Sequence, residues 1–170
     1  MKRKVQVQES KQWIAEALFK LMGSQALETI TITQLVKEAQ LTRMTFYRHF
    51  ASIDDVLNFS LTQIVDEIRF ELNKIPEPDL SDLLLLRFKV LYRHVSRLKF
   101  NTQSNLDYLI ERFRAKQVKI FFGLFKSDLS PFELHYHMGG IDAVTRQWIN
   151  EGMKQSPEEI TQAIMKLIQG

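Results

Sequence analysis

The stretch from Ile30 to Phe50, ITITQLVKEAQLTRMTFYRHF, decides the fold. Its first part predicts a short helix from about Gln34 to Ala39, because Leu35, Val36 and Ala39 supply one apolar face. We expect Thr33 to be the N-cap, since a threonine hydroxyl can accept a hydrogen bond from an N–H group of the first turn. The residues that follow, Gln40 and Leu41, then form a tight turn.

The second part of the stretch predicts another short helix, capped by Thr42 and turned inward through Phe46 and Phe50 at i and i+4. Apart from Met44, the remaining positions are polar, and all point outward. They gather hydrogen-bond donors suited to DNA phosphates and base edges on an element narrow enough for a major groove. These residues are Thr42, Arg43, Thr45, Tyr47, Arg48 and His49. The pattern is typical of a helix-turn-helix.

Composition sets the broad class. The chain has 170 residues, 45% hydrophobic and 25% charged, which is ordinary for a folded soluble protein of one or two domains. Cysteine is absent, which excludes disulfides and thiolate zinc sites and fits a reducing cytoplasm. No apolar run approaches the roughly 20 residues of a membrane span, so no membrane partner is expected. The N-terminus lacks the apolar core of a signal peptide.

Charge is unevenly distributed along the chain. Residues 51–86 hold two Lys/Arg and eight Asp/Glu, whereas residues 87–126 hold ten Lys/Arg and two Asp/Glu. The favoured interpretation is that the acidic block neutralises part of the basic block within the fold. The alternative is that the basic block meets an anionic effector or an acidic partner.

Apolar residues recur at helical spacing almost throughout, and no useful β-alternation is found. Residues 1–9 are expected to form a mobile basic arm, followed by a helix from about Ser10 to Met22 that Gly23 ends. Ser52 starts a longer helix that runs to about residue 74. Further helices are predicted at about 80–100, 104–126, 131–150 and 157–169, where Pro131 and Pro157 suit first-turn positions.

The fold class expected from these patterns is all-α. A three-helix helix-turn-helix bundle occupies the N-terminal part, and an antiparallel helical bundle occupies the C-terminal part. We place the DNA-binding domain at residues 1–52 and the second domain at residues 53–170. The long helix that begins near Ser52 would join the two.

These motifs resemble the TetR family of bacterial transcriptional regulators. The pattern I-T-x-x-x-L-V-x-x-A-x-L-T spans Ile32–Thr42, T-F-Y-R-H-F spans Thr45–Phe50, and S-x-D-D-V-L spans Ser52–Leu57. The specific match covers roughly residues 10–60. The segment Thr45–Phe50 is the most diagnostic, because an ordinary helical core has no reason to group Tyr, Arg and His beside two inward phenylalanines.

The resemblance implies a homodimer that places two recognition helices in successive major grooves of a palindromic operator. Carried over position by position, Thr33, Thr42, Thr45, Tyr47 and His49 resemble phosphate and groove contacts. Arg43, Met44 and Arg48 resemble base-reading or groove-edge positions. Two positions depart from the family pattern: Ile53 stands where a phosphate-binding lysine is frequent, and Met44 where a small residue is usual. Lys37, Arg43 or Arg48 could compensate for the missing lysine.

The resemblance also implies an effector pocket and a dimer interface in the C-terminal part. The candidate pocket residues are Phe88, Tyr92, Phe113, Phe121 and Trp148. For each of them, plain core packing is the favoured alternative. The candidate interface residues are Ile141, Trp148, Ile160, Ile164 and Leu167.

No metal or cofactor is expected. His135 and His137 on one helix would point about 200° apart, which is poor ligand geometry, and no acid lies at i+4 from either. The sequence contains no paired-acid or nucleophile–base constellation of a catalytic site and no glycine-rich phosphate loop, so an enzyme is not indicated.

The sequence therefore predicts a cytoplasmic homodimeric repressor that binds palindromic DNA and is released by a small-molecule effector. Three alternatives stay open. The chain could be an activator or co-activator, a nucleoid-type scaffold of the same fold without a small-molecule switch, or a helical protein-interaction adaptor that has lost DNA binding.

Overall fold

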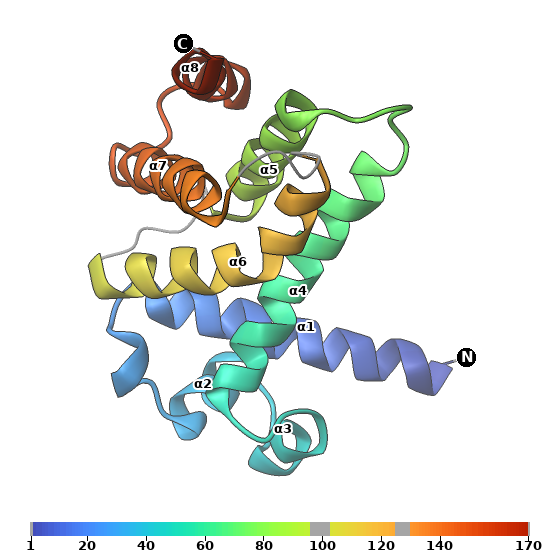
Figure 1. Ribbon diagram of the computed structural model, residues 1–170. Coiled ribbons are helices and arrows are strands. Elements are labelled where there is room, and N and C mark those ends of the chain that lie inside the picture. The colour runs from blue at the N-terminus through green and yellow to red at the C-terminus, as the bar shows by residue number, and fades with distance from the viewer. Residues whose placement is uncertain (1, 96–102, 125–129, 170) are drawn as a thin grey trace. The chain divides into compact units, whose positions relative to one another are not determined.

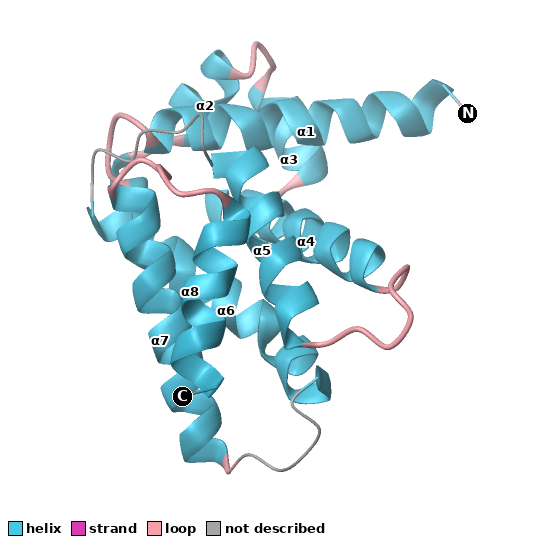
Figure 2. Cartoon of the chain, turned by 90° about the horizontal axis from the view of Figure 1, so that it is seen from above, coloured by secondary structure: helices cyan, strands magenta, loops and turns pink. Residues whose placement is uncertain are grey.

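The computed structural model describes the backbone of residues 2–95, 103–124 and 130–169, and every regular element within these ranges is helical (Figures 1 and 2). The predicted all-α class is confirmed. The elements in chain order are α1 (Lys2–Met22), the 3-10 helix η1 (Leu27–Thr29), α2 (Ile32–Glu38), α3 (Arg43–His49), α4 (Ile53–Leu72), α5 (Leu80–Val95), α6 (Gln103–Leu124), α7 (Pro131–Asn150) and α8 (Pro157–Gln169). None of the described helices combines the length and the apolar character that a membrane span requires.

The chain divides into two compact units. The first comprises residues 1–62 and 98–106, and the second comprises residues 63–97 and 107–170. The division falls inside α4, after Thr62, whereas the sequence suggested a boundary after residue 52. The first ten residues of α4 group with the first unit, and Val56 and Leu57 among them are buried.

Helix α1 begins far earlier than predicted. The backbone of residues 2–9, expected to be a mobile arm, continues the helix. Ser10 does not cap it, because its hydroxyl donates to the carbonyl of Gln6 at 2.8 Å, one turn back. The predicted end is confirmed, since α1 stops at Met22 and the Gly23 N–H donates to the Phe19 carbonyl at 3.1 Å. The residues between Lys2 and Ser10 include no glycine or proline that would stop the helix.

The first unit is a small helical bundle in which α1, α2 and α3 pack on one another. Its fully buried side chains come from all three helices and from the start of α4. They are Ile14, Leu18, Met22, Leu35, Phe46, Val56 and Leu57. The helix-turn-helix is thus built on an apolar core rather than exposed as a loop.

One side chain, Asn105 near the start of α6, holds the connector between α1 and α2. Its amide oxygen accepts a hydrogen bond from the Leu27 N–H at 2.8 Å. Its amide nitrogen donates to the carbonyls of Met22 and Gln25 at 2.9 and 2.8 Å. These three bonds satisfy buried or partly buried backbone groups and fix the position of the segment that leads into α2.

In the second unit, α8 packs against both α5 and α7. The predicted starts of α7 and α8 are confirmed. Ser130 and Glu133 form a reciprocal capping box with Pro131 in the first turn. Ser156 and Glu159 exchange the same pair of bonds at 2.7 and 3.2 Å ahead of α8. Helix α5 is described only to Val95 and α6 only to Leu124, so the remaining parts of their predicted ranges lie outside the described residues.

Candidate DNA-binding surface and the core of the second unit

The first helix of the motif is capped two residues earlier than the sequence suggested. Thr31, not Thr33, is the N-cap: its hydroxyl accepts from the Gln34 N–H at 3.2 Å, and its own N–H donates to the Gln34 side chain at 2.8 Å. Thr33 lies inside the first turn of α2 and is exposed. The pattern Thr-x-x-Gln is a capping box, and this signal could have located the cap in the sequence.

The turn between the two helices is tight and depends on one unusual backbone angle. Gln40 has a φ of 54°, in the left-handed region. The next N–H, of Leu41, donates to the Val36 carbonyl at 2.8 Å, which closes the end of α2. The chain can then reverse direction within a few residues and begin α3.

The recognition helix α3 is short and closely held. The predicted cap is confirmed, because the Thr42 hydroxyl accepts from the Thr45 N–H at 3.1 Å. The predicted inward pair is also confirmed, since Phe46 and Phe50 are buried. The Phe46 ring packs edge-on against Tyr47, with centroids 5.4 Å apart. These interactions fix the rotation of α3 about its axis, so its remaining side chains face away from the core.

The structure brings the predicted DNA-contacting residues together on the outward side of this motif. Thr42, Arg43 and Arg48 are exposed, and Met44 and Tyr47 are 73% and 54% exposed. Thr45 and His49 are partly covered at the edges of this surface. The arrangement can present hydroxyl, guanidinium and imidazole donors to one groove of a duplex.

Positive charge is concentrated around the end of α3. Burial lowers the pKa of His49 below its ordinary value of 6.5, and the nearby charges of Lys11 and Arg48 lower it further. Lys11 belongs to α1 and was not among the residues predicted to contact DNA. Its ammonium lies 5.9 Å from the centroid of the Phe50 ring and 5.5 Å from that of Phe59. No spacing rule could have paired residues 11 and 49, because only the packing of α1 on α3 brings them together.

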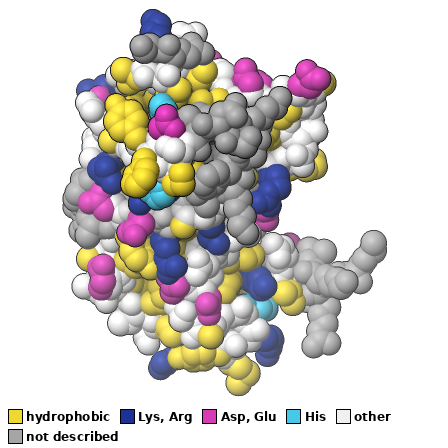
Figure 3. All heavy atoms as spheres, in the orientation of Figure 1, with side chains coloured by type: hydrophobic (Ala, Val, Ile, Leu, Met, Phe, Trp, Pro, Cys, Tyr) yellow, Lys and Arg dark blue, Asp and Glu magenta, His cyan; other side chains and the backbone are white. Residues whose placement is uncertain are grey.

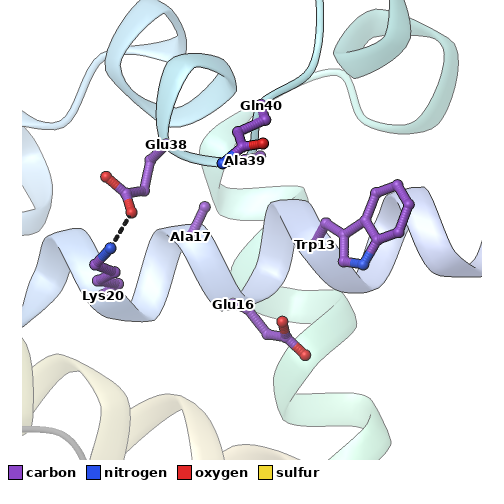
Figure 4. A pocket seen from close by; sticks show the side chains of 7 residues that line it. All are labelled: Trp13, Glu16, Ala17, Lys20, Glu38, Ala39 and Gln40. Atoms are coloured by element: carbon purple, nitrogen blue, oxygen red, sulfur yellow. Dashed lines mark hydrogen bonds and ion pairs between the residues drawn. The ribbon is translucent and has the colours of Figure 1, made fainter.

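Two shallow hollows flank this surface and share one wall, the indole of Trp13, which is 49% exposed. One, of about 420 Å³, lies between α1 and the end of α2, where Lys20 forms an ion pair with Glu38 (Figure 4). The other, of about 570 Å³, lies between α1 and α3 and is bordered by Arg48 and His49. Both lie within the first unit.

The predicted effector residues fall mostly inside the second unit. Phe88 and Trp148 are buried and pack edge-on, with ring centroids 5.3 Å apart. Tyr92 is 42% exposed, with its ring 6.2 Å from Trp148. Phe113 is also buried, and the side chain of Phe121 lies outside the described residues. Three of the five therefore share one site, where they pack on one another as core residues do.

A buried polar network, which was not predicted from the sequence, crosses the same unit. Arg87 is 1% exposed and donates to Gln117 and, at 3.1 Å, to Asp142. Its guanidinium also lies 5.1 Å from the centroid of the Phe113 ring. Burial raises the pKa of Asp142, and the charges of Arg87 and Arg114 oppose that rise. The signal was available in the sequence, because Arg87 and Asp142 occupy positions on the apolar faces of their helices.

Two donors of this network have no acceptor among the described residues. They are the Nε of Arg87 and the side-chain nitrogen of Gln117, both buried. Buried N–H groups are nearly always satisfied in proteins by protein atoms, water or a ligand. These two N–H donors could therefore bind one or more additional acceptor oxygens.

The five predicted interface residues differ in burial. Ile141, Ile160 and Ile164 are buried within the chain, and the Trp148 indole donates to the Gln155 carbonyl at 2.9 Å. Of the five, only Leu167 is exposed, at 75%. Helix α8 packs against both α5 and α7.

The exposed apolar side chains of α7 lie on another face, at Phe132 (87% exposed) and Tyr136 (79%). In the view of Figure 3, hydrophobic and histidine side chains gather where Figure 1 places α7. Within the described residues, no three His, Asp or Glu side chains are grouped as a metal site would require.

Comparison with known proteins agrees with this geometry. The model of "Bacterial regulatory proteins, tetR family" matches residues 14–58, and that of "Transcriptional regulator C-terminal region" matches residues 88–170. Among solved structures, the chain is similar to "Dihydroxyacetone kinase operon activator DhaS", with 23% identity, 94% of each chain covered and a TM-score of 0.59. That likeness concerns the fold. No curated protein sequence matches the chain.

A capped helix-turn-helix with exposed cations, built on an all-helical chain, defines a DNA-binding transcriptional regulator. The two matched regions assign the chain to the TetR family of bacterial regulators.

Proposed function

We propose that this protein is a homodimer that binds an inverted-repeat operator through α3 and represses the adjacent genes. The observation that carries the proposal is the outward face of α3, where Arg43, Tyr47 and Arg48 are exposed while Phe46 and Phe50 fix the helix in the core. Arginine to guanine is the commonest specific base contact, and Tyr47 and His49 suit phosphates. As a regulator of genes, the protein would work in the cytoplasm.

The proposed dimer interface lies on the exposed face of α7, together with Leu167 of α8. Phe132, Tyr136, Gly140 and Ala143 are all exposed and recur at i, i+4, i+8 and i+11. A Cβ atom added at Gly140 would meet nothing within 4 Å, so a second helix can approach closely there. Two large exposed rings beside small residues favour a helix–helix contact with a second copy over exposure to water.

Control by a small molecule is supported by the buried network of Arg87, Gln117 and Asp142. A ligand with a carboxylate or carbonyl oxygen would supply the acceptors that the Arg87 Nε and the Gln117 amide do not find among the described residues. The rings of Phe88, Phe113 and Trp148 would offer an apolar surround. Such a ligand would act by favouring one of two conformations of the dimer.

Activation instead of repression is the second candidate. It is favoured by the name of the solved structure with the same fold, an operon activator. The two candidates use the same DNA contacts and differ in where the operator lies relative to a promoter.

The experiment that tests the proposal is selection of bound fragments from random and genomic DNA at two salt concentrations. We expect an inverted repeat, and weaker retention at high salt, because phosphate contacts release counterions. Deletion of the gene followed by transcript measurement at the neighbouring genes then separates repressor from activator. Retention without a motif would point to a scaffold, and no retention at low salt would contradict DNA binding.

A further inference from the structure

The cations of the first unit differ in their partners. Lys20 on α1 forms an ion pair with Glu38. Lys11 on the same helix, and Arg43 and Arg48 on α3, form no ion pair with an acid within the described part of the chain. Three unpaired cations from two packed helices make a surface that lacks its counter-charge.

Lys11 is also held in place, unlike a typical surface lysine. Its ammonium lies over the Phe50 and Phe59 rings, at 5.9 and 5.5 Å from their centroids, and the residue is only partly exposed. Phe50 is the C-cap of α3, and Phe59 lies in the second turn of α4. A cation fixed by two aromatic faces loses little side-chain entropy when it meets an anion.

The ammonium also lies beside the end of the recognition helix. The charges of Lys11 and Arg48 both act on His49, which places the three groups near one another. Of the acids on α1, Glu9 borders the hollow between α1 and α3, and Glu16 is engaged with the Gln12 amide at 3.2 Å. The positive charge around His49 is therefore not cancelled by an acid paired to Lys11 or Arg48.

We propose that Lys11 is a DNA-contacting residue, which binds a backbone phosphate next to the one reached from the end of α3. The inference rests on the proposed function, since it concerns the same DNA-bound state. In the DNA-bound state, α1 extends the phosphate-binding surface beyond the helix-turn-helix, and the rings of Phe50 and Phe59 set the position of the Lys11 ammonium. Such an interaction would add affinity and register without reading sequence.

The test uses three variants of the full-length protein. Lys11→Met keeps an unbranched side chain over the two rings and removes the charge. Lys11→Arg keeps the charge. Lys20→Met is the matched control, because it removes a lysine from the same helix that already has an acidic partner. The probe is duplex DNA of mixed sequence, and afterwards the selected operator, each titrated over a range of salt concentrations.

We expect Lys11→Met to weaken binding about tenfold at low salt, and Lys11→Arg and Lys20→Met to change it little. The slope of log K against log salt should fall by about 0.9 for each phosphate that is no longer neutralised, so by roughly 1.8 for a dimer. The melting temperature should stay close to that of the unaltered protein in all three variants.

Two results would overturn the proposal. If Lys11→Met binds like the unaltered protein, with the same salt slope, the lysine does not touch DNA. If it binds more weakly but with an unchanged slope and a lower melting temperature, Lys11 only packs on the rings. If the unaltered protein binds no DNA at low salt, both the proposed function and the role of Lys11 are contradicted.

Discussion

The two units of this chain differ in which of their cations are paired with acids. In the first unit, Lys11, Arg43 and Arg48 have no acidic partner among the described residues. In the second unit, several cations are paired with acids: Lys89 pairs with Glu158 at 3.0 Å and Arg93 with Glu67 at 2.7 Å.

The difference shows why local charge density is a poor guide to anion binding. The sequence segment 87–126 is the most basic of the chain, yet its described cations include Arg87 and Arg114, both bound to Asp142. The pair Glu67–Arg93 joins the acidic block 51–86 to this basic block, as the favoured interpretation of the sequence expected. The less basic N-terminal segment holds Lys11, Arg43 and Arg48, which have no ion pair with an acid among the described residues.

Breaking the buried pair of the second unit should have the largest effect. Asp142→Ala leaves the Arg87 guanidinium buried without its carboxylate, which costs about 3–5 kcal/mol of unfolding free energy. Chemical denaturation measures this loss. The double variant Arg87→Met with Asp142→Leu should recover most of it, because no uncompensated charge remains. A single variant as stable as the unaltered protein would show that the pair does not hold the core.

The dimer interface should give the next largest effect. Phe132→Glu combined with Tyr136→Glu places charge on the exposed face of α7, and we expect monomers in sedimentation, with a loss of dimer affinity of about 2–4 kcal/mol. The fold should persist, since neither ring is buried in the chain. Ile164→Asp is unsuitable for this purpose, because Ile164 is 2% exposed and a charge there would unfold the protein. A double variant that stays dimeric would place the interface elsewhere.

Removing a cation from the first unit should affect binding and leave stability nearly unchanged. Arg48→Ala should weaken operator binding by about 1–3 kcal/mol, and Tyr47→Phe should weaken it less. Unfolding free energies should stay within about 0.5 kcal/mol, because both side chains are exposed. Band-shift titration and thermal melting measure the two quantities. Unchanged binding in both variants would contradict the assignment of this face to DNA.

The corrected cap of α2 gives a smaller and purely local effect. Thr31→Ala removes the acceptor for the Gln34 N–H and should cost about 1 kcal/mol of stability. Thr33→Ala is the control, since Thr33 lies inside the helix and its loss should stay within about 0.5 kcal/mol. Equal stability losses in the two variants would reject the capping box. Thr33→Ala remains informative for DNA binding, because Thr33 is exposed on the motif.

What could be predicted from sequence follows the range of the interactions. Periodicity and capping rules located Thr42, Phe46 and Phe50, Gly23 at the end of α1, and the Ser-Pro starts of α7 and α8, because each is set by residues within one turn. The start of α1 was missed because Ser10 resembles a cap but bonds back to Gln6. The candidate interface residues remain a prediction, because an apolar helix stripe does not say whether its partner is the same chain or another copy. The charges of Arg87 and Asp142 on apolar helix faces could have been noticed in the sequence. Which partners Arg87 and Lys11 have depends on packing between distant helices, which no local pattern encodes.

The smallest effect concerns protonation of His49, which should lower the stability of the free protein and strengthen its binding to DNA. In the free protein the pKa of His49 is below 6.5, because of burial and then of Lys11 and Arg48, so protonation favours the unfolded state. Stability from this residue is therefore present above pH 6.5 and declines as the pH falls toward the lowered value. A DNA phosphate close to His49 would favour the protonated ring. Operator affinity should therefore rise modestly as the pH falls over the same interval, while stability declines. Titrating operator binding and melting temperature across pH 6.5 measures both trends, and His49→Gln should flatten them. If operator affinity instead decreases as the pH is lowered, in parallel with stability, then no phosphate lies near His49.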